Sequence, residues 1–196
     1  MKKFFVITIL MTALLPAKGQ VPAKRIQPQP VDSAELAMRQ KYIEQMRAMQ
    51  AERMKMVGKP FTDLEEADVN GTMHKLSEYA GHGRWLFVDF WASWCGPCRA
   101  EMPNVVANYE KYHDKGFDIV GLSFDKDKNA WLRAISDLKM NWTHLSDLQG
   151  WQTKAAQVYN VRSIPSSLLI DPQGVIVAID LRGAQLGDKL KEIFGE

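Results

Sequence analysis

The stretch VDFWASWCGPCRAEMP, residues 88–103, holds both cysteines of the chain, Cys95 and Cys98. The near-continuous apolar run at residues 85–91 is typical of a central strand that is buried on both faces. A helix is expected from about residue 95 to residue 115. A Cys-x-x-Cys pair that follows a buried strand directly and begins a helix indicates a redox couple.

The place of the cysteines on this helix explains how they would react. Cys95 lies at the helix N-terminus, where the backbone N–H groups and the helix dipole favour a thiolate. Cys98 lies one turn further, shielded by the helix but near enough to attack Cys95. Gly96 permits a tight turn, and Pro97 suits the first helical turn, where its missing N–H costs nothing. We therefore expect an attacking thiol and a resolving thiol.

Two other uses of a close cysteine pair are disfavoured. A disulfide with a two-residue spacer closes a very small loop, so it gains little loop entropy as a structural staple. A structural zinc site needs four ligands. The histidines show no paired spacing: they are His74, His82, His113 and His144. We expect no metal, and thiol–disulfide exchange needs no organic cofactor.

The N-terminal segment, residues 1–19, has the pattern of a secretory signal peptide. Two lysines precede an apolar run at residues 4–15, and Ala17 and Gly19 fit a cleavage site before Gln20. The alternative is a membrane anchor, but the run is shorter than the roughly 20 residues that cross a bilayer. No cysteine follows it, so the lipid attachment point of a bacterial lipoprotein is missing. We expect a protein that is periplasmic or otherwise exported.

Removal of this segment would change the charge of the chain. The whole chain carries a formal charge of +2, and Lys2, Lys3 and Lys18 would be lost, which leaves a mature charge of about −1. No basic stripe remains to suggest a nucleic acid as partner.

A proline-containing linker is expected at residues 20–30, followed by a helix within residues 31–57. The helix carries apolar side chains at steps of three, four and seven: Met38, Tyr42, Met46, Met49 and Met56. Thioethers are soft metal ligands, but methionine more often fills an irregular packing surface. We expect this face to pack against the domain or against a partner.

Strand and helix patterns alternate through the remaining domain, residues 58–196. A hairpin with strands at residues 61–64 and 72–76 surrounds Asn70-Gly71, which favours a tight turn. The other strands are expected at residues 117–124, 166–171 and 175–180, and the helices at residues 128–138, 151–159 and 186–194. This order predicts an α/β fold whose mixed central sheet has helices on both faces, with an N-terminal hairpin and an extra N-terminal helix.

The motifs resemble those of a known family. Residues 94–98, WCGPC, match the thioredoxin active site, and residues 87–92 resemble the central strand of thioredoxins. Residues 163–165 resemble the loop that carries a cis-proline facing the cysteines. The longer stretches WCGPCRAEMP and IPSSLLIDPQG are more similar to the exported TlpA/ResA branch of thiol-disulfide oxidoreductases. The resemblance covers about residues 58–195 and implies a thioredoxin-like fold and that activity.

Two carboxylates near the cysteines are candidates for proton transfer. Asp89 interrupts the apolar strand, where an unpaired carboxylate is costly. Glu101 falls on the helix face shared with Cys98. By resemblance, thioredoxins use an aspartate at the first position and ResA-like proteins a glutamate at the second. Alternatively, Asp89 is a polar residue at a strand end and Glu101 a solvated helix residue, so the proton acceptor stays open.

Substrate binding is also assigned by the resemblance. If Pro165 is cis, the backbone of Ile164 is placed to pair with an extended substrate segment. Trp94 and Trp91 are expected to form an apolar rim, although core packing is the alternative for each. The residues expected to bind substrate are Trp94, Gly96, Pro97, Ile164 and Pro165.

We expect an enzyme that reduces the disulfides of exported proteins, because the Gly-Pro dipeptide and the isoleucine before Pro165 are those of thioredoxins. The family implies a membrane electron donor, whereas the oligomeric state is left open. One alternative is a peroxidase of the AhpC/TSA type, but Ala92 stands where its Thr-x-x-Cys site has threonine. Another is a partner-binding module that uses the methionine-rich helix. Selectivity is expected within residues 125–148.

Overall fold

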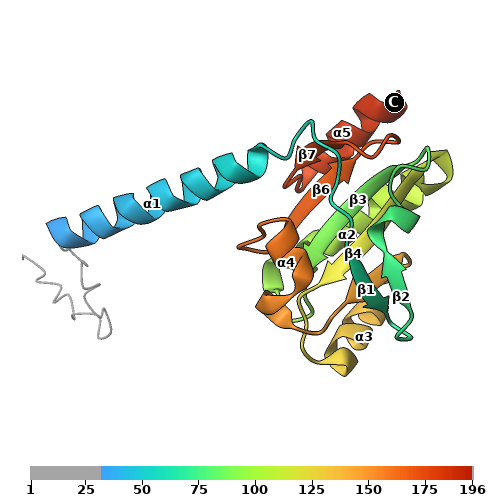
Figure 1. Ribbon diagram of the computed structural model, residues 1–196, viewed down its shortest axis with the longest axis horizontal. Helices are drawn as coiled ribbons and strands as arrows, with labels where there is room; N and C mark the ends of the chain where they lie inside the picture. Colours follow the sequence, from blue (N-terminus) through green and yellow to red (C-terminus); the bar gives the residue numbers. More distant parts are fainter. Residues whose placement is uncertain (1–31, 196) are drawn as a thin grey trace, which may run out of the picture. The chain divides into compact units, whose positions relative to one another are not determined.

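The computed structural model describes residues 32–195, which contain one seven-stranded mixed sheet in the order β2-β1-β5-β4-β3-β6-β7. Figure 1 shows β3 and β4 in the middle of this sheet. The strands are β1 Glu65–Asp68, β2 Met73–Lys75, β3 Trp85–Trp91, β4 Phe117–Ser123, β5 Thr143–Ser146, β6 Ser166–Ile170 and β7 Ile176–Ile179.

The same residues form five α-helices and three short 3-10 helices. The α-helices are α1 Ser33–Met54, α2 Gly96–Tyr112, α3 Lys128–Asp137, α4 Lys154–Val158 and α5 Ala184–Phe194. The 3-10 helices are η1 Leu76–Glu78, η2 His113–Lys115 and η3 Gly150–Gln152. The expected thioredoxin-like α/β fold, with its hairpin and extra N-terminal helix, is therefore confirmed.

Strand β3 is the centre of the fold, as its apolar run predicts. It pairs in parallel with β4 and antiparallel with β6, so both of its edges are hydrogen-bonded. From residue 86 to residue 91 every side chain is buried. Asp89 is the one charged residue in that run, and it lies between Gly121 of β4 and Ser167 of β6.

The alternation of side chains along β3 sorts the two faces of the sheet. Asp89 and Trp91 share a face. This face is covered by α2, because Trp91 contacts His144, which contacts Trp142, which in turn contacts Tyr109 of α2. Helix α5 lies against α2. On the opposite face, the Phe90 ring contacts the Tyr159 ring at the end of α4.

The N-terminal hairpin forms, but its first strand is not where the sequence pattern placed it. Residues 61–64 are not a strand, and β1 begins at Glu65. Asp63 explains the shift, because its carboxylate accepts hydrogen bonds from the backbone N–H groups of Leu64 and Ser77 and closes a loop there. Gly71 occupies the turn at positive φ, as expected.

Strand β5 is not among the predicted strands, and it lies within residues 125–148, where selectivity is expected. It runs parallel to β4 and antiparallel to β1, so it joins the hairpin to the main sheet. Four residues give too little periodicity to distinguish a strand from a loop. The helix expected at residues 151–159 is in fact η3 and α4, separated by Thr153, whose side chain bonds to Glu66 rather than continuing a helical pattern.

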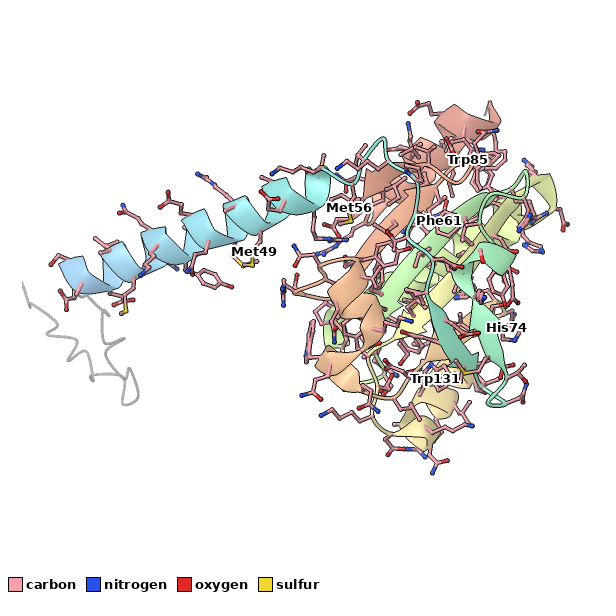
Figure 2. The ribbon with its side chains drawn as sticks, in the orientation of Figure 1. Met49, Met56, Phe61, His74, Trp85 and Trp131 are labelled. Atoms are coloured by element: carbon pink, nitrogen blue, oxygen red, sulfur yellow. A yellow bond between two sulfur atoms is a disulfide. The ribbon has the colours of Figure 1, made fainter. Side chains whose placement is uncertain are left out.

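Helix α1 agrees with the helical pattern of the methionine-rich segment, and Figure 2 labels Met49 on it and Met56 in the turn after it. Tyr42 is 63% exposed, whereas Met49 and Met56 are half-buried. Arg53 is buried and forms a 2.8 Å ion pair with Asp180. Residues 1–31, including the expected signal peptide and linker, lie outside the described residues. Among the helices of residues 32–195, none is long and apolar enough to cross a membrane.

Candidate active site

The two cysteines form a disulfide at the N-terminus of α2. Cys95 is the N-cap residue, and its sulfur accepts a hydrogen bond from the backbone N–H of Cys98 at 3.2 Å. Cys98 is fully buried and Cys95 almost so, whereas Gly96 and Pro97 are exposed at the helix start. The bond from the Cys98 N–H, together with the positive end of the helix dipole, therefore stabilises a Cys95 thiolate after reduction.

The loop before Cys95 is held by a carboxylate that the sequence analysis did not single out. Asp125 is buried two residues after the end of β4 and accepts hydrogen bonds from the N–H and the hydroxyl of Ser93, at 2.9 and 2.5 Å. The hydroxyl of Ser123 donates a third bond to it. An acid shortly after a buried strand is the signal that could have found it. Asp125 fixes the backbone that leads into Trp94 and Cys95.

Asp89 lies beneath the helix that carries the cysteines. Its side chain is buried on the α2 face, and its Oδ2 atom accepts no hydrogen bond within the described residues. Burial away from water, followed by the nearby negative charge of Glu101, raises the pKa of Asp89 from 3.8 to about 7. A carboxyl group with this pKa exchanges a proton near neutral pH.

Glu101 is a tethered side chain rather than a freely solvated one. Its Oε1 atom accepts hydrogen bonds from the side-chain amide of Asn104 and from the backbone N–H of Gly183, both at 2.7 Å. Asn104 also donates to the carbonyl of Gly183, so the same contacts join α2 to the loop before α5. These bonds hold a negative charge near Asp89.

The loop before β6 is the second part of the candidate site. The Ile164–Pro165 peptide bond is cis, as the resemblance implied. Ile164 is half-buried, and Ser163 beside it is exposed. Arg182 donates a hydrogen bond to the carbonyl oxygen of Pro165, which links this loop to the one that holds Glu101.

The two tryptophans have different environments. Trp94 is 55% exposed beside Cys95, and its Nε1 donates to the carbonyl of Phe124 at 3.3 Å. Trp91 is fully buried against His144, so its expected place in an apolar rim is wrong. It is the last residue of β3, and the side-chain alternation of the strand directs it under α2. Burial also lowers the pKa of His144 to about 3, so this ring is neutral at physiological pH.

The described residues bring together no group of three or more histidine, cysteine, aspartate or glutamate side chains that could hold a metal ion. The site consists of the disulfide, the buried Asp89, the tethered Glu101, Trp94 and the loop of Ile164 and Pro165. It combines two sulfur atoms with a buried carboxyl group whose pKa is raised to about 7.

Comparison with known proteins is consistent with this site. Residues 57–179 match the AhpC/TSA family. Thiol-disulfide oxidoreductase ResA of Bacillus thuringiensis subsp. konkukian is 30% identical over 136 residues, which is 69% of this chain and 75% of ResA. ResA of Bacillus anthracis is 31% identical over 142 residues, 72% of this chain and 79% of ResA.

Similar solved structures are also those of thiol-disulfide oxidoreductases. A thiol-disulfide oxidoreductase from Bacteroides fragilis has a TM-score of 0.64 and 30% identity, covering 69% of this chain and 99% of that one. The thioredoxin domain of a thiol-disulfide oxidoreductase from Bacteroides vulgatus has a TM-score of 0.64 and 30% identity, covering 70% and 97%.

Proposed function

This chain is a thiol-disulfide oxidoreductase of the AhpC/TSA family, in its thioredoxin-like TlpA/ResA branch, and we propose that it reduces the disulfides of exported proteins. The observation that carries the proposal is the arrangement of a Cys95–Cys98 couple at a helix N-terminus above a buried carboxyl group, Asp89. The first cysteine is placed to form a thiolate, and the second is shielded until a mixed disulfide forms.

The reaction begins with the reduced couple. The Cys95 thiolate attacks one sulfur of the substrate disulfide, and the other substrate sulfur leaves as a thiolate. Cys98 then loses its proton and attacks Cys95 Sγ, which releases the second substrate sulfur as a thiolate. The substrate has gained two electrons, and the enzyme is left as the Cys95–Cys98 disulfide.

Asp89 is the proton acceptor for Cys98 in this proposal. It lies on the face of β3 that α2 covers, and Cys98 is on the buried face of α2. Its pKa of about 7 suits a general base at neutral pH, whereas a carboxylate of ordinary pKa is a weak base there. Glu101 acts as a positioning residue, because its charge raises the pKa of Asp89 and its hydrogen bonds hold that charge in place.

The reducing direction rests on the residues between and near the cysteines. Gly96-Pro97 and Ile164 are the residues of thioredoxin, whose reduction potential is about −270 mV, against about −120 mV for the oxidant DsbA. A reductant outside the cytoplasm needs a source of electrons. We assign this role to a membrane electron donor that reduces the Cys95–Cys98 disulfide, and we assign export to residues 1–19.

Peroxide reduction of the AhpC/TSA type is the competing activity, because residues 57–179 match that family. Ala92 contributes no hydroxyl group at the position where the Thr-x-x-Cys site has threonine. The activities separate in two assays: insulin precipitation with dithiothreitol, and consumption of hydrogen peroxide. We expect insulin reduction that is lost in Cys95→Ser, and mixed disulfides that accumulate on Cys95 in Cys98→Ser. Peroxide consumption without insulin reduction would reject the proposal.

A further inference from the structure

A pocket of about 540 Å³ opens beside the redox site. Trp94, which precedes Cys95, forms one wall, and Trp151 of η3 forms another, with their ring centroids 6.2 Å apart. Phe124 contacts Trp151 edge-on, with centroids 5.1 Å apart. Two exposed tryptophan rings, with the buried Phe124 behind them, therefore line a space whose lining includes Ser93 and Trp94, the two residues that precede the attacking cysteine.

The two carboxylates that line the pocket already accept hydrogen bonds from other residues of the chain. The Asp125 carboxylate accepts bonds from Ser93 and Ser123, and the Asp127 carboxylate caps α3 by accepting from two backbone N–H groups. Lys126 lies close against Gly150, where an added Cβ atom would be 2.7 Å from the lysine Cε atom. Its methylene stem therefore adds apolar surface at the pocket.

The walls of the pocket are fixed before anything binds. Trp94 is held through its bond to the Phe124 carbonyl, and η3 is followed by Thr153, whose buried hydroxyl donates to Glu66 at 3.0 Å. Ala130 lines the pocket from α3, and its neighbour Trp131 is almost fully buried on that helix (Figure 2). A preformed apolar pocket binds an apolar group without the cost of ordering its walls.

Trp94 and Trp151 nevertheless remain 55% and 46% exposed. We propose that the pocket between them is a specificity subsite, which takes an aromatic or large aliphatic side chain next to the target cysteine of a protein disulfide. The occupant is a substrate side chain, because Trp94, which lines the pocket, is the chain neighbour of Cys95, where the substrate sulfur reacts. This inference rests on the proposed function, since it assumes a protein disulfide as substrate.

The test uses two peptides that differ only in one residue beside their single cysteine, tryptophan in one and alanine in the other. Each peptide carries glutathione as a mixed disulfide, and released glutathione is measured by chromatography after mixing with the reduced full-length protein. We expect the second-order rate constant to be about tenfold higher for the tryptophan peptide, as a filled hydrophobic pocket allows. In Trp151→Ala the ratio should fall below about two, and Trp151→Phe should retain most of it.

Leu132→Ala is the matched control, because Leu132 is an exposed apolar residue of α3 outside the pocket lining, and it should keep the wild-type ratio. Equal rate constants for the two peptides in the wild type would overturn the subsite while leaving disulfide reduction intact. Failure to reduce either peptide or insulin would instead reject the proposed function. If the pocket is covered by a second copy, size-exclusion chromatography should show a dimer that Trp151→Ala dissociates, and the subsite is then rejected.

Discussion

Replacing Asp89 by asparagine should change how the stability of the oxidised protein depends on pH. Asp89 has a pKa of about 7 in the folded chain and an ordinary value of 3.8. A raised pKa means that the folded state holds the proton more tightly than the unfolded state. The stabilisation is therefore complete below pH 3.8 and is lost as the pH rises to about 7.

The magnitude follows from the same two values. At about 1.4 kcal/mol for each pH unit between 3.8 and 7, ionised Asp89 costs the folded state about 4 kcal/mol. Asp89→Asn removes this ionisation and keeps the shape of the side chain. Relative to the wild type, the free energy of unfolding of the variant should rise by about 3 kcal/mol between pH 4.5 and pH 8.5.

The assay is guanidinium unfolding followed by circular dichroism, at half-unit pH steps, with the disulfide intact. Subtracting the wild-type curve from that of the variant cancels every other titrating group. Glu66 provides the matched control, because it lies on β1, away from the cysteines. Burial, followed by the charge of Asp147, raises its pKa from 4.5 to about 7, and its carboxylate accepts a hydrogen bond from Thr153. Glu66→Gln should give a similar profile for stability but retain insulin reduction. If the wild type and Asp89→Asn have parallel curves, Asp89 is not a buried base and the proposed proton transfer is wrong.

Three further predictions concern the surroundings of the site. Glu101→Gln should lower the pKa of Asp89, because it removes the nearby negative charge, and an NMR titration of the Asp89 carboxyl carbon measures this. Gly121→Ala should destabilise the fold by about 1–3 kcal/mol, since the added Cβ would lie 2.5 Å from Nδ1 of His144. Arg53→Ala should cost about 3 kcal/mol in denaturant unfolding, because it leaves the largely buried Asp180 carboxylate without its charged partner, with the hydrogen bonds from Ser166 and Ser167 remaining.

Two of these predictions have a control variant nearby in the chain. Glu110→Gln, on the exposed side of α2, should leave the Asp89 titration in place, and a shift equal to that of Glu101→Gln would contradict the assignment of the coupling. Lys55→Ala breaks an exposed ion pair with Glu52 and should leave the unfolding midpoint unchanged. A Gly121→Ala protein as stable as the wild type would show that the His144 ring moves aside without cost.

The sequence was sufficient for the features that depend on local pattern. The apolar run of β3, the helix start at Cys95 and the turn at Gly71 each follow from neighbouring residues, and the structure contains all three. Strand β5 could not be predicted in this way, because it forms by pairing with β1 and β4, which are distant in sequence.

The site residues likewise divide into those that a local sequence pattern predicts and those that depend on contacts between distant residues. Cys95 and Cys98 were identified from their spacing, and the burial of Asp89 from its place in an apolar strand. The tether of Glu101 to Gly183 and the bond from Ser93 to Asp125 join residues that are far apart in sequence, so no spacing rule predicts them. Whether Trp91 is exposed in an apolar rim or buried in the core also depended on which face of the sheet α2 covers.

The proposal that the protein is a reductant is tested most directly by the midpoint potential of the Cys95–Cys98 couple. The wild type is equilibrated in glutathione buffers of graded ratio, and the fraction of disulfide is measured by thiol alkylation and mass spectrometry. We predict a potential close to that of thioredoxin, about −270 mV. A potential of about −120 mV, that of DsbA, would show that the couple donates disulfides to its partners and would contradict the account.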